Sequence, residues 1–551
     1  MPDRAERQSP EDGPPVREEP FHAYLDREPG VSNVQLFGFD IQPVVFPLSV
    51  LAVVVAVTLT IGLGEQAAAA YQTVFEVVNR NFGWLYILAV NVFLLAMIAF
   101  GVSRYGSIRI GGPDTEPEFS RSEWLTMLFT AGMGVGLLFF GVAEPLHHFL
   151  SGGGSVFDVP PESPAAGRAA TAVTMFHWGV HPWAIYGIVG LGLAFFAFNR
   201  GLPLGFRSIF YPLLGSRIYG LPGHVVDLVA VIATVAGLST TMGLAALQID
   251  AGLDFVATNF LDTTVPISPW STALIVGVIV TITTLSVFAG LERGIKRLSQ
   301  ANVVLMLTLL AFVIVGGPTV YLFDVFASGI GAYLGNFLEL SFHAEAFAGQ
   351  DTGWQHDWTI FYWGFWIGWA PFVGMFIARI SKGRTIREFV GGVLVVPALF
   401  SLVWMAVFNG TALFVELNVL SGGIVGPLQH NGRAIAVFEM LSFYPFTLLT
   451  SLLVIVNLLT FTVTSLDSGS LVIGYLTAGG KRTVGARQRV VWPILIGVTA
   501  TVLLVGNGLN ALQTAVITTG LPFAVLILVM VYTIYLGLRS EADISQSEAS
   551  R

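Results

Sequence analysis

Cysteine is absent from the 551-residue chain, and this absence excludes disulfide scaffolds, thiolate metal sites and cysteine nucleophiles. Charge is also scarce, since Asp, Glu, Lys and Arg make up 11% of the residues, against about 25% in soluble domains. Basic residues are fewer than acidic ones, 26 against 35, which gives a net charge of -9. This charge argues against a nucleic-acid partner, because binding nucleic acid requires a basic surface. A soluble protein of this length needs more charge to cover its surface.

Motifs of ATP-driven and hydrolytic proteins are missing as well. The chain has no Gly-x-x-x-x-Gly-Lys phosphate loop, so nothing in it suggests ATP-driven pumping. His-Glu-x-x-His and Gly-x-Ser-x-Gly motifs are also absent, so an intramembrane enzyme is disfavoured and no organic cofactor is expected.

Long apolar runs take the place of charge, and hydrophobic residues make up 54% of the chain. Twelve runs of roughly 20 residues or more are each long enough to cross about 30 Å of hydrocarbon. We place them at residues 43–63, 84–103, 124–146, 170–198, 224–249, 271–291, 301–323, 358–379, 389–409, 444–478, 490–508 and 511–536. The tenth run is too long for one crossing, so part of it is expected in water or at the interface. The chain is predicted to be an all-α polytopic membrane protein with twelve transmembrane helices over residues 41–538.

The basic residues test this count, because they collect on the cytoplasmic side of membrane proteins. With the N-terminus inside, 23 of the 26 Lys and Arg residues fall on the inner side, and only Arg80, Arg168 and Arg433 fall outside. We therefore expect both termini in the cytoplasm of a cell whose plasma membrane, or bacterial inner membrane, holds the protein. Residues 1–40 are predicted to be a disordered acidic tail, and residues 539–551 a short second tail.

Two predicted spans are unusually rich in residues that interrupt helices. The third contains the Gly132–Gly136 stretch, followed by Pro145, and the eighth contains Gly364, Gly368, Pro371 and Gly374. If spans three to seven (124–323) and eight to twelve (358–536) are two five-helix halves, both lie first in their half. Paired interrupted spans of this kind point to the binding site of a secondary transporter. Close helix packing through small residues is the alternative, but the matched positions favour unwinding.

Aromatic residues gather on two helix faces at similar depth. At about 100° per residue, Trp178, Trp183 and Tyr186 share an arc of about 140°, and Trp363, Trp366 and Trp369 share one of about 120°. An aromatic cage of this kind stabilises a quaternary ammonium ion by about 2 kcal/mol or more when desolvated. Ordinary aromatic packing explains the same pattern, and the residues alone leave both explanations open.

Oxygen-bearing residues lie within the tenth apolar run, which would suit a hard cation such as sodium. The cluster comprises Thr462, Thr464, Ser465, Asp467 and Ser468. Serine and threonine in membrane helices also bond back to their own backbone, and this alternative stays open. Asp467 has two interpretations as well, as a gate or as part of a local hydrogen-bond network.

One outer segment is amphipathic and does not read as a span. Its apolar residues recur at helical spacing, at Phe326, Ile330, Tyr333, Leu334, Phe337 and Leu338. It is expected to lie flat at the membrane interface or to pack against another subunit.

These segments resemble a known family, the betaine/choline/carnitine transporters. The stretch Asp357–Trp366 is similar to the family's hallmark motif, except that Phe365 stands where Trp is usual, so the cage loses or softens one wall. Also similar are Gly132–Pro145, His177–Tyr186, Ala370–Phe389 and Phe461–Ser470. The resemblance covers about residues 40–540. It implies two N-terminal helices followed by a five-plus-five inverted repeat, the leucine-transporter-type fold, in a homotrimer with the amphipathic helix at the interface.

The resemblance also implies roles for individual residues. The aromatic box for a trimethylammonium group would be Trp178, Trp183, Tyr186 and Trp366, with Phe139, Trp363 and Trp369 beside it or along the pathway. The unwound backbone of Gly132, Met133, Gly134 and Gly136 would meet the substrate carboxylate. One sodium site would use Thr130, Met133, Phe461, Thr464 and Ser465. A second is half present, with Thr234 and Phe372 matching but Leu238 in place of a threonine.

Sodium-coupled symport of glycine betaine by alternating access is therefore the predicted function. Some choline-accepting members carry Asp where this chain has Gly136, so a zwitterion that brings its own carboxylate fits better. Uptake of choline, carnitine or ectoine, sodium-independent exchange of such solutes, and a receptor or channel that uses the same cage remain alternatives.

Overall fold

The computed structural model describes residues 29–64, 66–289, 292–346, 353–481 and 483–549. The larger helices are α1 (Val45–Leu63), α2 (Gln66–Val102), α3 (Arg121–Ala131), α4 (Val135–Leu150), α5 (Pro164–Trp178), α6 (Val180–Phe198), α9 (Leu221–Phe260), α10 (Pro269–Phe288), α11 (Glu292–Gly316), α12 (Thr319–Gly335), α15 (Phe361–Ile380), α16 (Ile386–Phe414), α19 (Thr447–Thr477) and α20 (Ala486–Ala549). Short helices connect them: η1 (Arg104–Ser107), α7 (Phe206–Ile209), α8 (Tyr211–Leu214), η2 (Gly215–Tyr219), α13 (Phe337–Phe342), α14 (Gly353–Gln355), η3 (His356–Ile360), η4 (Val415–Val419), α17 (Val425–Asn431), η5 (Arg433–Ile435) and α18 (Ala436–Ser442).

The polytopic all-α prediction agrees with these elements. Among the described residues, ten helices are long and apolar enough to cross a membrane, and the bent pair α3–α4 raises the number to eleven. The backbone of α20 leaves helical geometry at Asn507 and Gly508, directly before the gap that the sequence predicts at residues 509–510 between its last two spans. The predicted tenth span is one continuous helix of 31 residues, α19.

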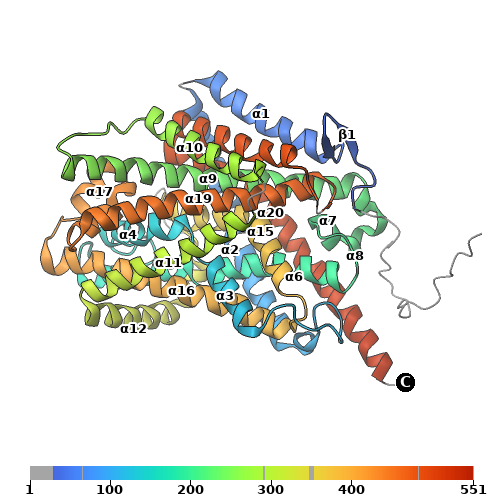
Figure 1. Cartoon of the computed structure of the whole chain (residues 1–551). Helices are drawn as coiled ribbons and strands as arrows, with labels where there is room; N and C mark the ends of the chain where they lie inside the picture. The colour runs from blue at the N-terminus through green and yellow to red at the C-terminus, as the bar shows by residue number, and fades with distance from the viewer. Residues whose placement is uncertain (1–28, 65, 290–291, 347–352, 482, 550–551) are drawn as a thin grey trace, which may run out of the picture.

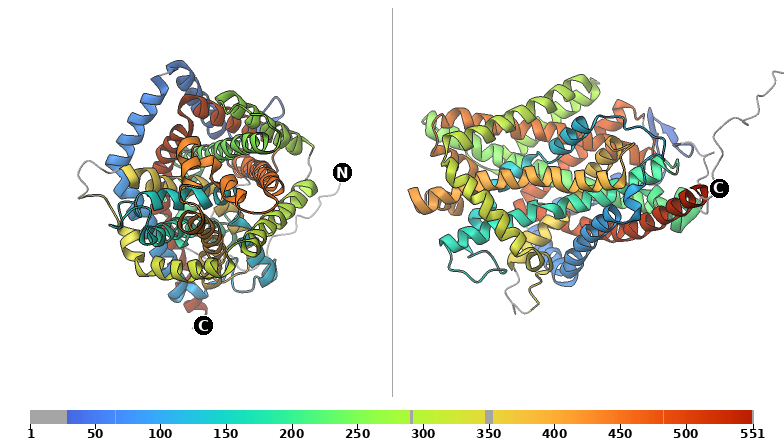
Figure 2. Two further views of the ribbon diagram at one scale, coloured as in Figure 1. Left: turned by 90° about the vertical axis from the view of Figure 1, so that its left-hand side faces the viewer. Right: turned by 90° about the horizontal axis from the view of Figure 1, so that it is seen from below.

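The long helices pack side by side along a common direction (Figure 1). The β-strands and the C-terminal part of α20 lie at one end of the molecule, and α17 lies at the opposite end. Seen along the helices, α1 lies at the edge of the bundle (Figure 2). Its most apolar window is only 22% buried, whereas those of the α5–α6 span and of α9 are 89% and 83% buried. The span that ends with α15 is also 83% buried, so the core forms around α5, α6, α9 and α15.

The end of the predicted acidic tail is ordered, which corrects the prediction of disorder up to residue 40. Strands β1 (Val34–Leu36) and β2 (Phe39–Ile41) form an antiparallel hairpin. Asn33 donates to the Ala478 carbonyl at 2.9 Å, and the Lys481 ammonium pairs with Asp40 and holds the pKa of that carboxyl below its ordinary value. These partners lie more than 400 residues away, so local composition could not reveal them. The rest of the predicted tail, residues 1–28, lies outside the described residues.

The third span is broken, as the sequence predicts. Helices α3 and α4 meet at 56°, and Gly134 between them is fully extended. The break is shorter than predicted, because helix resumes at Val135 and includes Gly136.

The prediction that the eighth span also unwinds is wrong. Helix α15 runs without interruption through Pro371, and only the π-helical turn η3 precedes it. Its glycines instead allow close packing: a Cβ at Gly364 would lie 3.1 Å from the Ile517 Cα, and one at Gly374 would lie 2.5 Å from a Val189 methyl. The small-residue alternative therefore holds for this helix.

A second break lies in the fourth span, where the sequence analysis expects a continuous helix. Helix α5 ends at Trp178 and α6 begins at Val180, with Gly179 between them in a non-helical conformation. Pro182 explains the position, because its ring has no N–H and collides with the carbonyl four residues earlier, that of Trp178.

Replacing Gly374 with Leu is expected to lower the thermal unfolding temperature of the detergent-solubilised protein. The added side chain has no room against Val189, and overpacking of this kind costs about 1–3 kcal/mol. Gly391→Leu on α16 is the matched control, because a Cβ there meets nothing within 4 Å. Equal unfolding temperatures for the two variants would contradict the packing role of Gly374.

Candidate functional site

A small cavity lies where the α3–α4 break meets α5, α6 and α15, with a volume of about 50 Å³. Its lining residues are Ala131, Gly132, Met133, Gly134, Val135, Gly136, Leu137, Trp178, Pro182, Trp183, Tyr186, Thr241, Phe365, Trp366, Trp369, Val373 and Ser401. All four residues of the predicted aromatic box are among them, together with Trp369 and the four predicted backbone positions. The two helix breaks thus place residues from distant parts of the chain around one space.

The aromatic rings stand at steep angles to one another. The Trp178 and Trp366 ring centroids are 4.9 Å apart with planes at 80°, and Trp183 and Tyr186 are 5.3 Å apart at 77°. Tyr186 and Trp366 are 6.4 Å apart at 84°. Perpendicular rings of this kind form the walls of a box, which is the geometry that a rounded cation requires.

The indole N–H groups that bond around the cavity are fixed by the surrounding protein. Trp178 donates to Glu144 Oε2 at 2.8 Å, Trp366 to the His177 carbonyl at 3.2 Å, and Trp369 to Thr241 Oγ1 at 2.9 Å. Because the indole N–H groups already have protein partners, it is the faces of these rings that are available to contact a ligand in the cavity.

Two residues predicted beside the box lie behind it. Phe139 packs against Phe140 with centroids 4.8 Å apart, and Trp363 packs against Phe176 at 5.3 Å; neither lines the cavity. The helical arc that groups Trp363 with Trp366 and Trp369 is too wide for all three to face one space. Phe365 lines the cavity instead, where the resemblance anticipates a changed wall.

The broken helix presents two opposite backbone ends at this site. The first N–H groups of α4, from Val135 onward, have no partner within their own helix and carry the positive end of its dipole. The last carbonyls of α3, near Thr130, carry the negative end of that shorter helix. The break can therefore contact an anion on one side and a cation on the other.

A second cavity of about 170 Å³ adjoins the first, and the two share Ala131, Met133, Trp369 and Val373 in their linings. It brings together the first predicted sodium set: Thr130, Met133, Phe461, Thr464 and Ser465. Ser299, Phe372, Phe376 and Ser468, with the shared Trp369, complete its polar and aromatic lining. Thr464 Oγ1 donates its hydrogen to the Thr460 and Phe461 carbonyls, both at 3.0 Å, so its lone pairs can still face a cation.

The second predicted sodium set does not gather around this cavity. Thr234 lies outside the cavity that Phe372 lines, and its hydroxyl donates to the Ala230 carbonyl at 2.7 Å. Leu238 packs against Gly469, so closely that a Cβ added at Gly469 would lie 2.4 Å from a Leu238 methyl. Asp467 pairs with Arg489 at 3.4 Å, which favours the local network over a gate.

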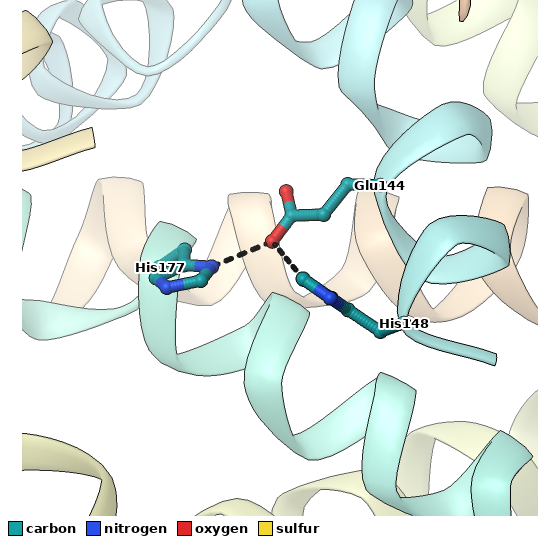
Figure 3. A group of neighbouring side chains, drawn as sticks. All are labelled: Glu144, His148 and His177. Atoms are coloured by element: carbon teal, nitrogen blue, oxygen red, sulfur yellow. Dashed lines mark hydrogen bonds and ion pairs between the residues drawn. The ribbon is translucent and has the colours of Figure 1, made fainter. Parts of the chain in front are cut away.

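A buried carboxylate with no predicted role, Glu144, accepts the indole N–H of the box residue Trp178. Figure 3 shows it together with two histidines, His148 and His177. Glu144 contacts His177 Nδ1 at 2.7 Å and His148 Nε2 at 3.4 Å, and all three side chains are buried. Their atoms lie within 4.8 Å of one another, close enough to hold a metal ion. The sequence does contain a signal for this site, because Glu144 is a carboxylate inside an apolar span. Placing a charged side chain in a membrane costs free energy, so such a residue is a candidate for a functional role.

Comparison with known proteins identifies the family. Residues 44–543 match the sequence model of the betaine/carnitine/choline family transporters. The chain belongs to this family. This transporter is therefore a multi-pass membrane protein for betaine-type solutes, and the family indicates a transporter and not an enzyme.

Individual relatives match nearly the whole transporter. A Vibrio parahaemolyticus protein named glycine betaine/proline/choline transporter is 40% identical over 540 residues, 94% of this chain and 95% of that protein. Glycine betaine transporter 1 of the same organism is 41% identical, covering 93% and 96%. The glycine betaine transporter of Acinetobacter baylyi is 39% identical, covering 92% and 75%.

Replacing Gly136 with Ala is expected to destabilise the transporter and displace an indole, because its Cβ would lie 2.7 Å from the Trp178 ring. Gly134→Ala is the matched control, since a Cβ there meets nothing within 4 Å and its extended backbone suits any residue. Thermal unfolding without ligand measures the difference. If the two variants unfold at the same temperature, Trp178 does not depend on the space at Gly136.

Proposed function

We propose that this transporter takes up glycine betaine by sodium-coupled symport, with alternating access around the cavity at the α3–α4 break. The observation that carries the proposal is the meeting of one broken helix with an aromatic box and an oxygen-lined second cavity. The names of the relatives support glycine betaine as the solute, since three of them include it.

The trimethylammonium end of the substrate belongs among the ring faces of Trp178, Trp183, Tyr186 and Trp366. A quaternary ammonium ion cannot donate hydrogen bonds, so attraction to the ring quadrupoles replaces the hydration that it loses. The box suits this group because the indole N–H groups of Trp178 and Trp366 already have protein partners.

The carboxylate end belongs at the start of α4. Backbone N–H groups at a helix N-terminus bind anions without a basic side chain. Among the described residues that line the cavity, none is charged. A zwitterion satisfies both ends of such a site, whereas an unpaired cation such as choline leaves the helix end unused.

Sodium belongs in the second cavity, held by the hydroxyls of Thr464 and Ser465 and by carbonyls of Thr130, Met133 and Phe461. The cavity and the predicted set coincide, and hydroxyl and carbonyl oxygens suit a hard cation. Because Met133 lines both cavities, occupancy of one can influence the backbone of the other. One sodium site is proposed, since only the first predicted set lines a cavity together.

The proposed architecture has twelve crossings: two N-terminal helices, then a five-plus-five inverted repeat of the leucine-transporter type over 124–323 and 358–536. The kink at Asn507 and Gly508, which divides α20, supports this count. Both termini are proposed to be cytoplasmic in a plasma or bacterial inner membrane. A homotrimer is proposed through α12 and α13, where Leu334 and Leu338 are exposed apolar residues.

Uptake by purified protein in liposomes tests the function. Radiolabelled glycine betaine, choline, carnitine and ectoine are supplied with an inward sodium gradient and without one. Accumulation of glycine betaine above its outside concentration, dependent on sodium, is expected. Equilibration without accumulation would indicate a channel, binding without uptake a receptor, and uptake indifferent to sodium an exchanger.

Trp366→Leu is expected to weaken glycine betaine binding at least about tenfold, equivalent to about 1.4 kcal/mol, because one wall of the box is lost. Binding to the purified variant is measured by isothermal titration. Trp84→Leu is the control, since Trp84 is 57% exposed on α2 and does not line the cavity. Unchanged affinity in a folded Trp366→Leu protein would remove this residue from the site.

Thr464→Ala is expected to raise the sodium concentration needed for half-maximal uptake about tenfold, because one hydroxyl ligand is lost. Thr462→Ala is the matched control: Thr462 is buried on the same helix, donates to the Leu458 carbonyl and does not line the cavity. Sodium titration of uptake in liposomes compares the two. Equal sodium dependence in both variants would place the ion elsewhere.

A further inference from the structure

The carboxylate of Glu144 lies on the far side of the Trp178 indole from the cavity. The residue is fully buried in α4, and its two oxygens receive separate sets of partners. Oε1 faces His148 and His177, whereas Oε2 accepts the Trp178 indole N–H and the Tyr362 hydroxyl. A buried carboxylate needs several hydrogen bonds to replace its water, and four partners supply them.

The neighbouring side chains fix the hydrogens of this network. Trp354 donates its indole hydrogen to His148 Nδ1 at 3.1 Å, so His148 Nε2 carries the other hydrogen and donates it to Glu144. His177 contacts Glu144 through Nδ1 and Thr359 through Nε2 at 3.0 Å. A metal ion on His148 Nε2 would require Nδ1 to hold a hydrogen, which would break the bond from Trp354. The hydrogen bonds therefore fit an anion better than a metal centre.

Two walls of the box are held through Oε2. Trp178 is bound directly, and Tyr362 is stacked on Trp366 with centroids 5.8 Å apart and planes at 17°. Oε2 thus holds the Trp178 ring directly through its indole N–H. It supports the Trp366 ring indirectly, through the Tyr362 phenol stacked on that ring. The nearest cationic side chain is that of Arg433, whose guanidinium lies 4.4 Å from the centre of the Trp358 ring, and Trp358 in turn packs against His148.

The charge of Glu144 also acts on the ring itself. An aromatic ring is negative on its face and positive at its edge, and the indole N–H is the most positive part of that edge. A carboxylate at this edge draws the N–H toward itself and leaves the face more negative. A permanent cation on the face then binds more strongly, whereas a neutral group of the same shape gains nothing.

We propose that Glu144 is a positioning and specificity residue of the substrate site: through the Trp178 N–H it holds the box in place and raises its preference for a quaternary ammonium over an uncharged isostere. This inference rests on the proposed function. It adds a residue that does not touch the substrate and a physical reason for charge selectivity in a cavity without a charged lining.

The test compares glycine betaine with 3,3-dimethylbutanoate, which has the same shape and carboxylate but a neutral carbon in place of nitrogen. Affinities are measured by isothermal titration on purified protein in sodium. Glu144→Gln, which keeps the shape and removes the charge, is expected to weaken glycine betaine binding about tenfold and to change binding of the neutral isostere less than about twofold. Glu439→Gln, a carboxylate of α18 outside the network, is the control and should bind both as the wild type does.

A double-mutant cycle locates the effect. In a Trp178→Phe background the ring has no N–H for Glu144 to hold, so adding Glu144→Gln should weaken glycine betaine binding by a smaller factor than it does in the wild-type background, with only the Tyr362 contact left to lose. If Glu144→Gln does not fold, Glu144→Asp replaces it. This variant keeps the charge but withdraws the oxygens, so it should weaken both ligands while retaining the preference for the cation.

The outcomes separate the two claims. A wild-type protein that binds no trimethylammonium compound refutes the proposed function. If the wild type binds glycine betaine and Glu144→Gln binds it equally well, or loses affinity for both ligands equally, the inference alone is overturned. A loss of glycine betaine affinity from Glu144→Gln that persists at the same size in the Trp178→Phe background also overturns the inference. Stoichiometric zinc in the purified protein, removed by His148→Ala, would also overturn it by making the cluster a metal centre.

Discussion

Backbone pairing is the constraint on which the rest of this structure depends. In hydrocarbon an unpaired N–H or carbonyl costs several kcal/mol, so a spanning helix is interrupted only where protein or a cavity receives the freed groups. Among the described residues, two predicted spans are interrupted away from their ends, one at Gly132–Gly134 and the other at Gly179, and residues at or beside both interruptions line the same cavity. One freed carbonyl, that of His177, receives the Trp366 indole. The breaks therefore supply both the polar groups of the site and the anchors for its aromatic walls.

Similar glycine patterns give different results in the third and eighth spans, and the difference lies in their neighbours. A Cβ added at Gly134 would meet nothing within 4 Å, so close packing does not explain this glycine, and its backbone is extended. A Cβ added at Gly364 or Gly374 would instead lie 3.1 Å from Ile517 or 2.5 Å from Val189, so these glycines serve close helix packing in a continuous helix. A sequence shows which residues permit a break, but only the packed bundle shows which of them use it.

Features set by local periodicity could be predicted, and features set by distant partners could not. The apolar runs, the broken third span and the two aromatic arcs follow from residue spacing alone. Five of the six arc residues line one cavity and Trp363 does not, and it is the family resemblance that selects Trp178, Trp183, Tyr186 and Trp366 among them. The hairpin at Val34–Ile41 depends on Ala478 and Lys481, and the Glu144 network joins α4, α5 and α15. Such contacts join residues that are far apart in the chain and meet only in the folded bundle, so a short segment of sequence cannot reveal them.

The charges around the cavity give the proposed site a direction. The carboxylate of Glu144 lies behind Trp178, while the positive end of the α4 dipole lies at Val135 on the cavity. Both belong to α4, so one helix carries an anion near its middle and a positive N-terminus at the break. A zwitterion can lower its energy at both places at once only in one orientation, with its ammonium toward the rings and its carboxylate toward the break. Reversal sets each charge against its own sign, and a simple cation gains from one end alone. Because the lining itself is uncharged, an empty cavity leaves no buried charge exposed when it opens to either side.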